Sequence, residues 1–461
     1  MPLGLAYLAA ALRKNNFPVE VIDAWVERLD SDRLAKRIMG MGKYDLIGIT
    51  VSSPGYAEAV KIIRVIRSLS PNSKIIIGGT HPSSLPAECM SDNPEVDFVA
   101  VGEGDHLIVE LANALADNQT DFSKIKGLLY REGGKINNNG RAEAIKNLDE
   151  LPFPARDLFP LFKYCSHPPY RLHKAYATLI TSRGCPYQCT YCTKSVSGQN
   201  YRAQSASRVV REIESLIAEH RVKQIHFYDD DFTINMKRVE DICDALIEKK
   251  IKILWSCVTR VDLVNEKLLS KMRQAGCWLI AYGVESGNQG ILNKIKKGYT
   301  IEEIQQAFRL TKQTGIRTLG YFMAGLPGET YATLNDTVKL SLSLELDFVS
   351  WSITALYPGS ELYEQAANGR LGDNYVRVTA PVAQHFSSVS SLSPFAHGHT
   401  FIYKGNIPCD YILKTVNQAY RRFYFRPGYL IGFVMKLQTI TETLSYFGTL
   451  FNYLSWTIKR R

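Results

Sequence analysis

The residues best suited to chemistry are three cysteines in the stretch SRGCPYQCTYC, namely Cys185, Cys189 and Cys192. A structural zinc site takes four ligands, usually as two pairs, and no second pair lies nearby in the sequence. A ferredoxin-type cluster needs a fourth cysteine at short range, whereas the next one, Cys243, falls within an expected helix. Three thiolates on one loop can hold a [4Fe–4S] cluster and leave one iron open. The spacing therefore predicts a cluster whose open iron binds a small molecule.

These cysteines follow the first of six strand–helix units, which we place at residues 171–395. Apolar, β-rich runs alternate there with helical patterns such as RVVREIESLIAEH, which is typical of parallel β/α folds. Six units predict a partial (β/α)6 barrel rather than a closed barrel of eight, with its chemistry at the C-terminal ends of the strands. The expected strands are YATLITSRGC, QIHFYDDDF, ILWSCVTRVD, WLIAYGVESG, TLGYFMAGLPG and FVSWSITALYPG.

Residues 1–145 form a separate region, for which we predict a doubly wound, flavodoxin- or Rossmann-like α/β domain. The helix LGLAYLAAALRKN is followed by strands within PVEVIDA, YDLIGITV, SKIIIGGTHP and VDFVAVGEGD. Ligands bind at the C-terminal edge of such sheets, because the backbone is open there and helix N-termini point toward it. The alternative is that the glycines only turn strands into helices. The strand-end residues are Thr50, Ser52, Ser53, Gly78, Gly79, Thr80, Gly102, Glu103 and Gly104.

Two further segments complete the expected organisation. Residues 146–170 are rich in proline, and we interpret them as an extended linker between the two domains. Residues 396–461 are aromatic and basic, and their amphipathic helical pattern is broken at RPG. We expect this region to be a C-terminal helical cap packed on the barrel. A face that contacts a membrane surface, or a lid over a lipophilic substrate, is the alternative.

Composition narrows the class of protein. The chain has 461 residues, of which 45% are hydrophobic and 22% are charged, as in ordinary globular domains. The net charge of +10 comes without a basic stripe of interleaved aromatic residues, so we expect no nucleic-acid partner. Nine cysteines, an odd number, favour a reduced thiol set over disulfides. With no visible secretory signal and no apolar run of about 18 residues, we expect a cytoplasmic protein.

The CxxxCxxC spacing, the aromatic Tyr191 before the last cysteine and the six β/α units resemble the radical S-adenosylmethionine (SAM) superfamily. The resemblance implies that Cys185, Cys189 and Cys192 are the cluster ligands and that Tyr191 approaches the adenine of SAM. In that superfamily SAM binds the open iron, and electron transfer from the cluster releases a 5′-deoxyadenosyl radical. An external one-electron reductant, of the flavodoxin or ferredoxin type, is then required.

Later strand ends carry motifs that look like the SAM contacts of this superfamily. In YDDDF, either Asp229 or Asp230 is expected to face SAM, and the alternative is an acidic cluster at a helix N-terminus. Arg260 in VTRVD is expected to pair with the SAM carboxylate or, alternatively, to form a structural ion pair. The motifs GVES and GLPGET place Glu285, Ser286 and Gly325 at the next two strand ends, toward ribose, carboxylate and adenine.

The combination of both domains resembles the cobalamin (B12)-binding radical SAM enzymes. It rests on PLGLAYLAAALRKNNFPVEVIDA, GGTHPSSLP, VDFVAVGEGD, LPFPARDLFP and FRPGY. The resemblance implies that cobalamin lies against the strand-end residues of the N-terminal domain. No Asp-x-His-x-x-Gly motif is present, so we interpret His81 as a loop histidine rather than a cobalt ligand. The first strand of such domains, which precedes PLGLAYLAA, is missing, and we expect an unpaired gap beside PVEVIDA.

These cofactors imply methylation of an unactivated carbon in a small-molecule substrate. The aromatic tail would suit a substrate that is bulky and apolar. The alternative is a radical cyclase, or another modification enzyme, acting on a tetrapyrrole ester or polycyclic lipid without methyl transfer. A non-catalytic iron–sulfur electron carrier would not need SAM-like motifs at the strand ends. A methylthiolating enzyme would carry three more cysteines in its N-terminal domain, which here has only Cys89.

Overall fold

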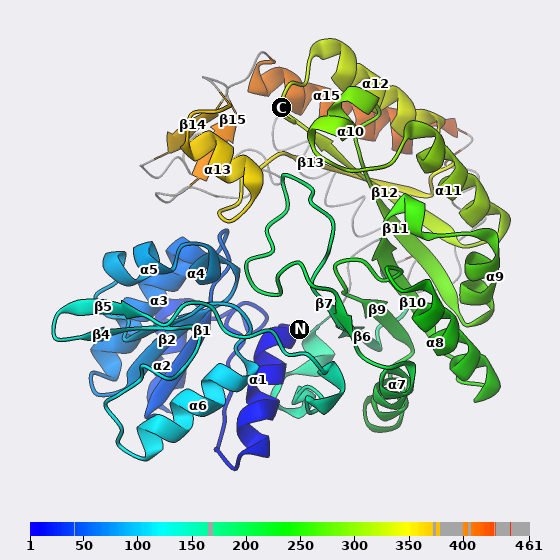
Figure 1. Ribbon diagram of the computed structural model, residues 1–461. Helices are drawn as coiled ribbons and strands as arrows, with labels where there is room; N and C mark the ends of the chain where they lie inside the picture. Colours follow the sequence, from blue (N-terminus) through cyan, green and yellow to red (C-terminus); the bar gives the residue numbers. More distant parts are fainter. Residues whose placement is uncertain are drawn as a thin grey trace.

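The structure is a computed structural model. It describes residues 1–40, 42–164, 169–371, 375–378, 400–403 and 407–427, together with positions 429 and 443. Two α/β bodies lie side by side in Figure 1, with the N-terminal body in blue and cyan and the larger body in green and yellow. The predicted domain limits at residues 145, 170 and 395 stay predictions, and the last of them lies outside the described residues.

The N-terminal body is a five-stranded sheet in the order β1-β2-β3-β4-β5. Strands β1, β2 and β3 are parallel, and the hairpin of β4 and β5 adds an antiparallel edge that we did not predict. The bounds are β1 Leu46–Thr50, β2 Lys74–Gly78, β3 Phe98–Ala100, β4 Leu128–Glu132 and β5 Lys135–Asn138.

Helices cover both faces of this sheet, as a doubly wound domain requires. Leu107, Ile108 and Leu111 of α6 pack on one face with Ile76 and Phe98. Helices α3 and α5 pack on the other. Both faces of β2 and β3 are therefore largely buried, which explains their continuous apolar sequences, whereas β1 is only partly covered. The bounds are α1 Leu3–Lys14, α2 Ser31–Met39, α3 Tyr56–Leu69, α4 Thr80–Ser84, α5 Pro86–Asp92 and α6 Asp105–Ala116.

One predicted strand was wrong. The segment PVEVIDA, residues 18–24, has no strand structure, and within the described residues β1 hydrogen-bonds only to β2. An extended segment becomes a strand only by pairing, and a cavity separates Val19 and Val21 from Leu46 of β1. The pattern that predicted a strand is present, but the backbone partner is not within reach.

The larger body is a six-stranded parallel sheet in the order β13-β12-β11-β10-β9-β6, which confirms the six β/α units. Because the order follows the chain and the two end strands do not pair, the barrel is open, as predicted. Its strands are β6 Tyr176–Leu179, β9 Gln224–Phe227, β10 Leu254–Thr259, β11 Cys277–Glu285, β12 Arg317–Ala324 and β13 Phe348–Ile353.

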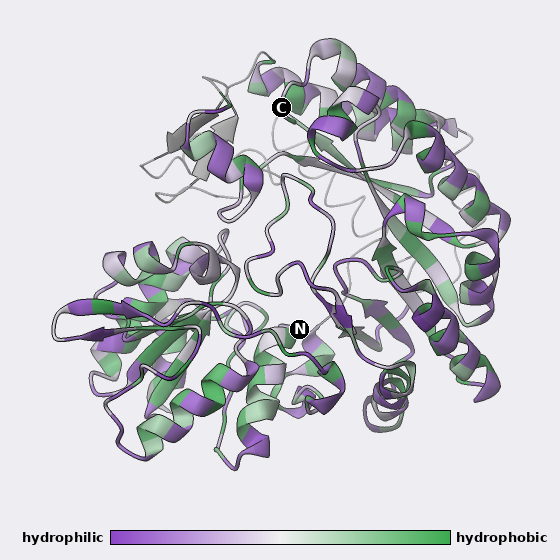
Figure 2. Ribbon diagram, in the orientation of Figure 1, coloured by the Kyte–Doolittle hydropathy of each residue, from purple (hydrophilic) through white to green (hydrophobic). Residues whose placement is uncertain are grey.

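Amphipathic helices cover the outer face of this sheet, with hydrophilic residues turned to solvent and hydrophobic residues turned to the strands (Figure 2). Ile280 and Tyr282 of β11 join that outer core, whereas Leu279 and Ala281 pack on the inner face with Leu172, which precedes β6. The helices are α7 Ala206–His220, α8 Met236–Glu248, α9 Glu266–Gln274, α10 Gln289–Lys294, α11 Ile301–Gln313, α12 Tyr331–Ser343 and α13 Glu361–Ala367.

The linker lies over both bodies in short 3-10 turns, Leu148–Glu150, Arg156–Leu158 and Leu161–Lys163. Arg156 forms a buried ion pair of 2.9 Å with Glu212 of α7. The linker is therefore held against the barrel by a contact in which neither charge faces water.

The described part of the C-terminal tail is mainly helix α15, Cys409–Tyr424. It packs against α12 and β13, and its tyrosine hydroxyls accept hydrogen bonds from the backbone of β13, at 2.8 Å for Tyr420 and 3.1 Å for Tyr424. These bonds satisfy donors along the free edge of the sheet. The other described elements of the tail region pair as a hairpin, β14 Tyr375–Val378 with β15 Thr400–Tyr403. None of the described helices has the length and apolarity needed to cross a bilayer.

Candidate functional site

The cysteine loop, which we define as residues 184–201, is closed at its base by a two-residue hairpin stem. Strand β7, Ser182–Arg183, pairs antiparallel with β8, Arg202–Ala203. Gly184 has φ +83°, and a Cβ there would lie 2.3 Å from the carbonyl oxygen of Asn200. Only glycine fits this close approach of the two sides of the loop. Figure 1 shows the loop extending between the two bodies.

The three thiols of this loop are free, and Cys192 is exposed. Burial of the sulfur, with Cys189, Asp230 and Cys185 nearby, raises the pKa of the Cys192 thiol to about 11. No three potential ligands converge on one point among the described residues. Cluster binding would therefore have to turn the thiols toward one another and displace their protons. The donor set, three unpaired thiols on one loop, fits a cluster held at three corners.

Tyr191 is fixed by a buried ion pair beneath the loop. Its hydroxyl donates to Glu285 Oε1 at 3.0 Å, and Lys297 Nζ lies 2.9 Å from the same oxygen. Burial alone would lower the pKa of Lys297, but Glu285 and nearby tyrosines raise it well above its usual value. Glu285 also has φ +65°, a conformation that few non-glycine residues adopt. Sequence reasoning found Tyr191 and Glu285 but missed Lys297, which carries no local signal.

The neighbouring strand-end residues differ in what they face. Ser286 is fully buried, and its hydroxyl lies 3.2 Å from that of Thr337 in α12. Gly325 has φ +81°, and its amide donates to Glu329 Oε2 at 2.6 Å. Burial raises the pKa of Glu329 to about 7, and within the described residues its Oε1 has no hydrogen-bond partner. Glu329 was also missed, although it lies within the quoted motif GLPGET.

The three acids of YDDDF take three different roles. Asp229 is buried and accepts hydrogen bonds from the hydroxyl of Thr181 at 2.6 Å and from the amide of Ser182 at 3.0 Å. Asp231 accepts from Thr259, and burial raises its pKa to about 6. Asp230 is the exposed member by its solvent-accessible surface, although desolvation of its carboxyl by the surrounding protein, and then the charge of Asp229, raise its pKa. Asp230 is thus the acid of this run whose side chain is accessible to a ligand.

Arg260 lies under the cysteine loop. Its guanidinium is 3.7 Å from the centre of the Tyr187 ring and forms two hydrogen bonds, of 2.9 and 2.8 Å, with Asp262. The structural ion pair that we weighed as an alternative is therefore present. Its Nη1 is buried without a hydrogen-bond partner among the described residues, which leaves one donor for an anionic group.

The strand ends of the N-terminal body open into a cavity of about 1370 Å³ that reaches the cysteine loop. Gly79 has φ +107°, and a Cβ there would lie 2.7 Å from the carbonyl oxygen of Val51. Ser52, Ser53 and Thr80 do not line the cavity. The buried His81 places Nδ1 3.0 Å from the hydroxyl of Ser53. The expected cobalamin contacts that do line it are Thr50, Gly78, Gly79, Gly102, Glu103 and Gly104.

Residues of the barrel form the other wall of this cavity. Ser182, Arg183, Tyr228 and Asp230 line it together with the glycine-rich strand ends. The cavity therefore joins the edge where a doubly wound domain binds its ligand to the end of the barrel where the cysteines lie. The same cavity also extends between residues 17–22 and β1, beside the segment where the sequence predicts an unpaired gap. The part of it along the open glycine loops and the barrel residues fits a large, flat cofactor at the edge of the N-terminal sheet.

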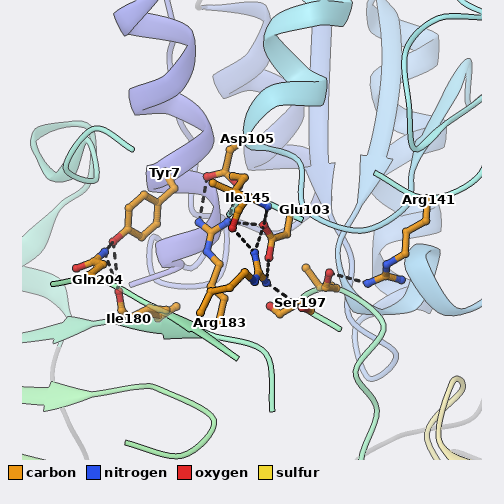
Figure 3. A network of polar contacts seen from close by, with 11 residues as sticks. Tyr7, Glu103, Asp105, Arg141, Ile145, Ile180, Arg183, Ser197 and Gln204 are labelled. Atoms are coloured by element: carbon orange, nitrogen blue, oxygen red, sulfur yellow. Dashed lines mark hydrogen bonds and ion pairs between the residues drawn. The ribbon is translucent and has the colours of Figure 1, made fainter. Parts of the chain in front are cut away.

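Two acid–arginine pairs connect the walls of the cavity. Arg183 forms two hydrogen bonds with Asp105, of 2.8 and 3.0 Å, and Arg202 forms two with Glu103, of 2.6 and 3.0 Å. Figure 3 shows Asp105 and Glu103 on the N-terminal body facing Arg183 on the barrel side. Glu103 Oε2 also accepts from the amide of Ile145 at 3.0 Å. The carboxylate of Glu103, an expected cobalamin contact, is thus engaged between the two bodies.

Comparison with known proteins identifies both bodies. Residues 179–341 match the family model of the radical SAM superfamily, and residues 1–112 match that of the B12 binding domain. A Pyrococcus horikoshii protein described as an uncharacterized methyltransferase is 33% identical over 444 residues, 94% of this chain and 92% of that protein. The anaerobic magnesium-protoporphyrin IX monomethyl ester cyclase of Rubrivivax gelatinosus is 29% identical over 435 residues, 93% of this chain and 74% of the cyclase.

A solved structure shares the fold. The radical S-adenosylmethionine methyltransferase TsrM from Kitasatospora setae, with cobalamin and a [4Fe–4S] cluster bound, has a TM-score of 0.73 at 20% identity, over 93% of this chain and 87% of TsrM. The cysteine motif agrees with the two family matches, with a relative above 30% identity over most of the chain, and with the shared two-domain fold. The chain therefore belongs to the radical SAM superfamily, among the members that carry a B12 binding domain ahead of the barrel.

Proposed function

We propose that this protein is a radical SAM enzyme that methylates an unactivated carbon of a small molecule with the help of cobalamin. The main support for the proposal is one continuous cavity that joins the glycine-rich strand ends to the cysteine loop. The relative from Pyrococcus horikoshii, a methyltransferase by name, supports methyl transfer. When bound, the cluster and SAM supply a radical that removes a hydrogen atom from carbon, and cobalamin supplies a methyl group that a second SAM replaces.

Different residues of the chain bind the cluster and the parts of SAM. Cys185, Cys189 and Cys192 hold the cluster, and Tyr191, fixed by Glu285, positions the adenosine part of SAM. Asp230 is accessible to the amino group of SAM. We assign the SAM carboxylate to the buried Nη1 of Arg260, which has no hydrogen-bond partner among the described residues. Asp229, Ser286 and Gly325 shape the same pocket from behind, since their polar groups bond to neighbouring protein atoms.

On the opposite wall, the strand-end glycines allow cobalamin to approach the backbone closely. Gly79 in particular leaves no room for a side chain. We propose the remaining strand-end residues, Thr50 and the glycines at 78, 102 and 104, as the lining of the corrin side of the cavity. Ser52 and Thr80 are exposed at the same strand ends and Ser53 contacts His81, so these three stay outside the lining.

The reaction needs one external electron per radical event, which we assign to a flavodoxin- or ferredoxin-type protein. We place the enzyme in the cytoplasm, because free thiols and an oxygen-sensitive cluster need a reducing compartment. A bulky, apolar substrate would suit the aromatic tail, most of which lies outside the described residues.

The test is anaerobic reconstitution with iron, sulfide and hydroxocobalamin, followed by reduction in the presence of methyl-labelled SAM. We expect bound corrinoid, a 5′-deoxyadenosine signal and S-adenosylhomocysteine. The triple variant Cys185→Ser, Cys189→Ser and Cys192→Ser is the control and should give none of the 5′-deoxyadenosine. A wild-type protein that loads iron yet forms neither nucleoside product would overturn the proposal.

One observation favours a second candidate, which is a radical cyclase without methyl transfer. The likeness to the Rubrivivax cyclase extends over 93% of this chain. The same assay separates the two, because a cyclase consumes SAM without transferring its methyl group. Formation of 5′-deoxyadenosine with no S-adenosylhomocysteine, in the presence of the true substrate, would favour the cyclase.

A further inference from the structure

Four charged side chains form a closed set where the two bodies meet, and we name Glu103, Asp105, Arg183 and Arg202 the interdomain lock. Each carboxylate binds one guanidinium through two parallel hydrogen bonds, and Arg183 also lies 3.4 Å from Glu103. Two positive and two negative charges balance, so the lock adds no net charge to the cavity. All four side chains are largely buried, from 13% exposed for Arg183 to 2% for Glu103.

The lock joins two short and rigid pieces of backbone. Arg183 and Arg202 are register partners across the hairpin stem of the cysteine loop. Glu103 and Asp105 flank Gly104 at the start of α6, where Asp105 is the first helical residue. Arg183 stands two positions before Cys185 in the sequence. The lock therefore ties the N-terminal body to the base of the loop that carries the first cluster ligand.

Weaker contacts continue along the same loop. Arg141 donates to the carbonyl oxygen of Val196 at 2.7 Å (Figure 3). The hydroxyl of Ser195 donates to the carbonyl oxygen of Thr80 at 3.0 Å. These bonds place the far side of the cysteine loop against the strand-end loops of the N-terminal body. The loop is thus held at its base by ion pairs and in its second half by hydrogen bonds that involve backbone carbonyl oxygens.

The ion pairs of the lock define a relative position more than they stabilise the fold. Buried ion pairs add little net stability compared with apolar residues of the same size, but bidentate pairs define one geometry. An apolar contact of the same area would tolerate sliding of one body over the other. A methyl transfer between two bound cofactors does not tolerate such sliding, because reacting atoms must meet within a few tenths of an ångström.

We infer that the interdomain lock sets the position of the cysteine loop over the cobalamin edge, and that its four residues are positioning residues for methyl transfer. The inference rests on the proposed function. It reassigns Glu103 from a cobalamin contact to this lock. Radical formation depends on the contacts of the cysteine loop with the barrel, such as those of Tyr187 with Arg260 and of Tyr191 with Glu285, which do not involve the lock. Methyl transfer also depends on the position of the N-terminal body, so loss of the lock affects methyl transfer more than radical formation.

The test uses the full-length protein with Glu103→Gln and Asp105→Asn together. We expect the ratio of S-adenosylhomocysteine to 5′-deoxyadenosine to fall by up to about 10²-fold, while 5′-deoxyadenosine formation changes by less than about threefold. Electron paramagnetic resonance of the loaded, reduced protein should show weaker magnetic coupling between the cluster and the cobalt. Arg202→Lys keeps the charge but loses the paired bonds, so we expect an intermediate loss.

Glu212→Gln is the matched control. Glu212 is as buried as Glu103 and also pairs with an arginine, yet it belongs to α7 and does not line the cavity. It should leave the product ratio and the magnetic coupling unchanged. Equal ratios in the lock variant and in this control would overturn the positioning role.

Hydrogen exchange of the cofactor-free protein tests the lock independently of the proposed function. In the lock variant the amides of residues 183–202 should exchange about tenfold faster or more, since local opening becomes easier. Unchanged exchange there would overturn the lock itself. If the wild type forms no S-adenosylhomocysteine, the methyl transfer and with it the positioning role are overturned, while exchange still decides whether the lock joins the bodies.

Discussion

Lys297 and Glu285 form an ion pair of 2.9 Å beneath the cysteine loop, with only 7% and 10% of their side chains exposed. The same lysine lies 3.0 Å from the hydroxyl of Tyr191, so three polar groups from three segments meet at one point. The strained backbone of Glu285 is thereby held by charges that have no access to bulk water. This pair links the end of β11 to the residue that precedes the last cysteine.

We predict that Lys297→Met destabilises the fold by about 3–5 kcal/mol, because it leaves the carboxylate of Glu285 buried without its partner. Denaturant unfolding of the cofactor-free protein measures this. Lys296→Met is the matched control, since Lys296 pairs with Glu361 at 2.7 Å but is half exposed. Its cost should stay below about 1 kcal/mol. Equal costs for the two neighbours would contradict the buried pair.

Removal of one cysteine of the loop should remove the cluster. We expect Cys185→Ser to reduce bound iron after anaerobic reconstitution from about four atoms per chain toward zero, because a hydroxyl is a poor ligand for iron in such clusters. Iron analysis and visible absorbance check this. Cys409→Ser is the control, as Cys409 is also a partly exposed free thiol but lies at the start of α15. Loss of iron in this variant as well would contradict a specific site.

Gly79→Ala should weaken corrinoid binding. Its Cβ would lie 2.7 Å from the carbonyl oxygen of Val51 and 3.2 Å from the hydroxyl of Thr50, so the strand-end loop has to move. Gly134→Ala provides the comparison, because Gly134 also has positive φ, at +79°, but has open space around it. We expect the Kd for corrinoid, titrated by absorbance, to rise at least about tenfold for Gly79→Ala, an effect of about 1.4 kcal/mol, and to stay unchanged for Gly134→Ala. Similar loading of both would exclude a close approach at position 79.

Glu329 predicts a pH dependence of stability. Burial raises its pKa from the usual 4.5 to about 7, so the folded state binds a proton that the unfolded state has released between these pH values. The contribution of this proton to the free energy of unfolding is fully present below pH 4.5 and is lost as pH rises to about 7. Between pH 6 and pH 8, the free energy of unfolding of Glu329→Gln should therefore rise by about 1.4 kcal/mol relative to that of the wild type.

Thermal or denaturant unfolding of both proteins at the two pH values measures this difference. The amide oxygen of glutamine can still accept the hydrogen bond from Gly325, so the loop should keep its shape. A difference between wild type and variant that does not change with pH would mean that the carboxyl is ionised in the fold.

Local signals in the sequence predicted most of the architecture. The period of apolar residues, with glycines at strand ends, identified the parallel strands and their helices, because these signals depend on neighbours along the chain. One local signal went unused, since Gly133 and Gly134 between two β-rich runs are typical of a hairpin turn. In contrast, PVEVIDA has a strand pattern without a strand, because pairing depends on a distant partner.

By itself the sequence determined the three thiols, their spacing and the strand ends that carry the polar motifs, since each of these is a property of consecutive residues. Only the tertiary structure decided which acid of YDDDF is accessible, that Lys297 neutralises Glu285, and that Glu103 meets Arg202 across the two bodies. Charges separated by 12 or 99 positions come together only when the sheets place them. The free energy of burying a charge depends on that placement, which no local pattern encodes.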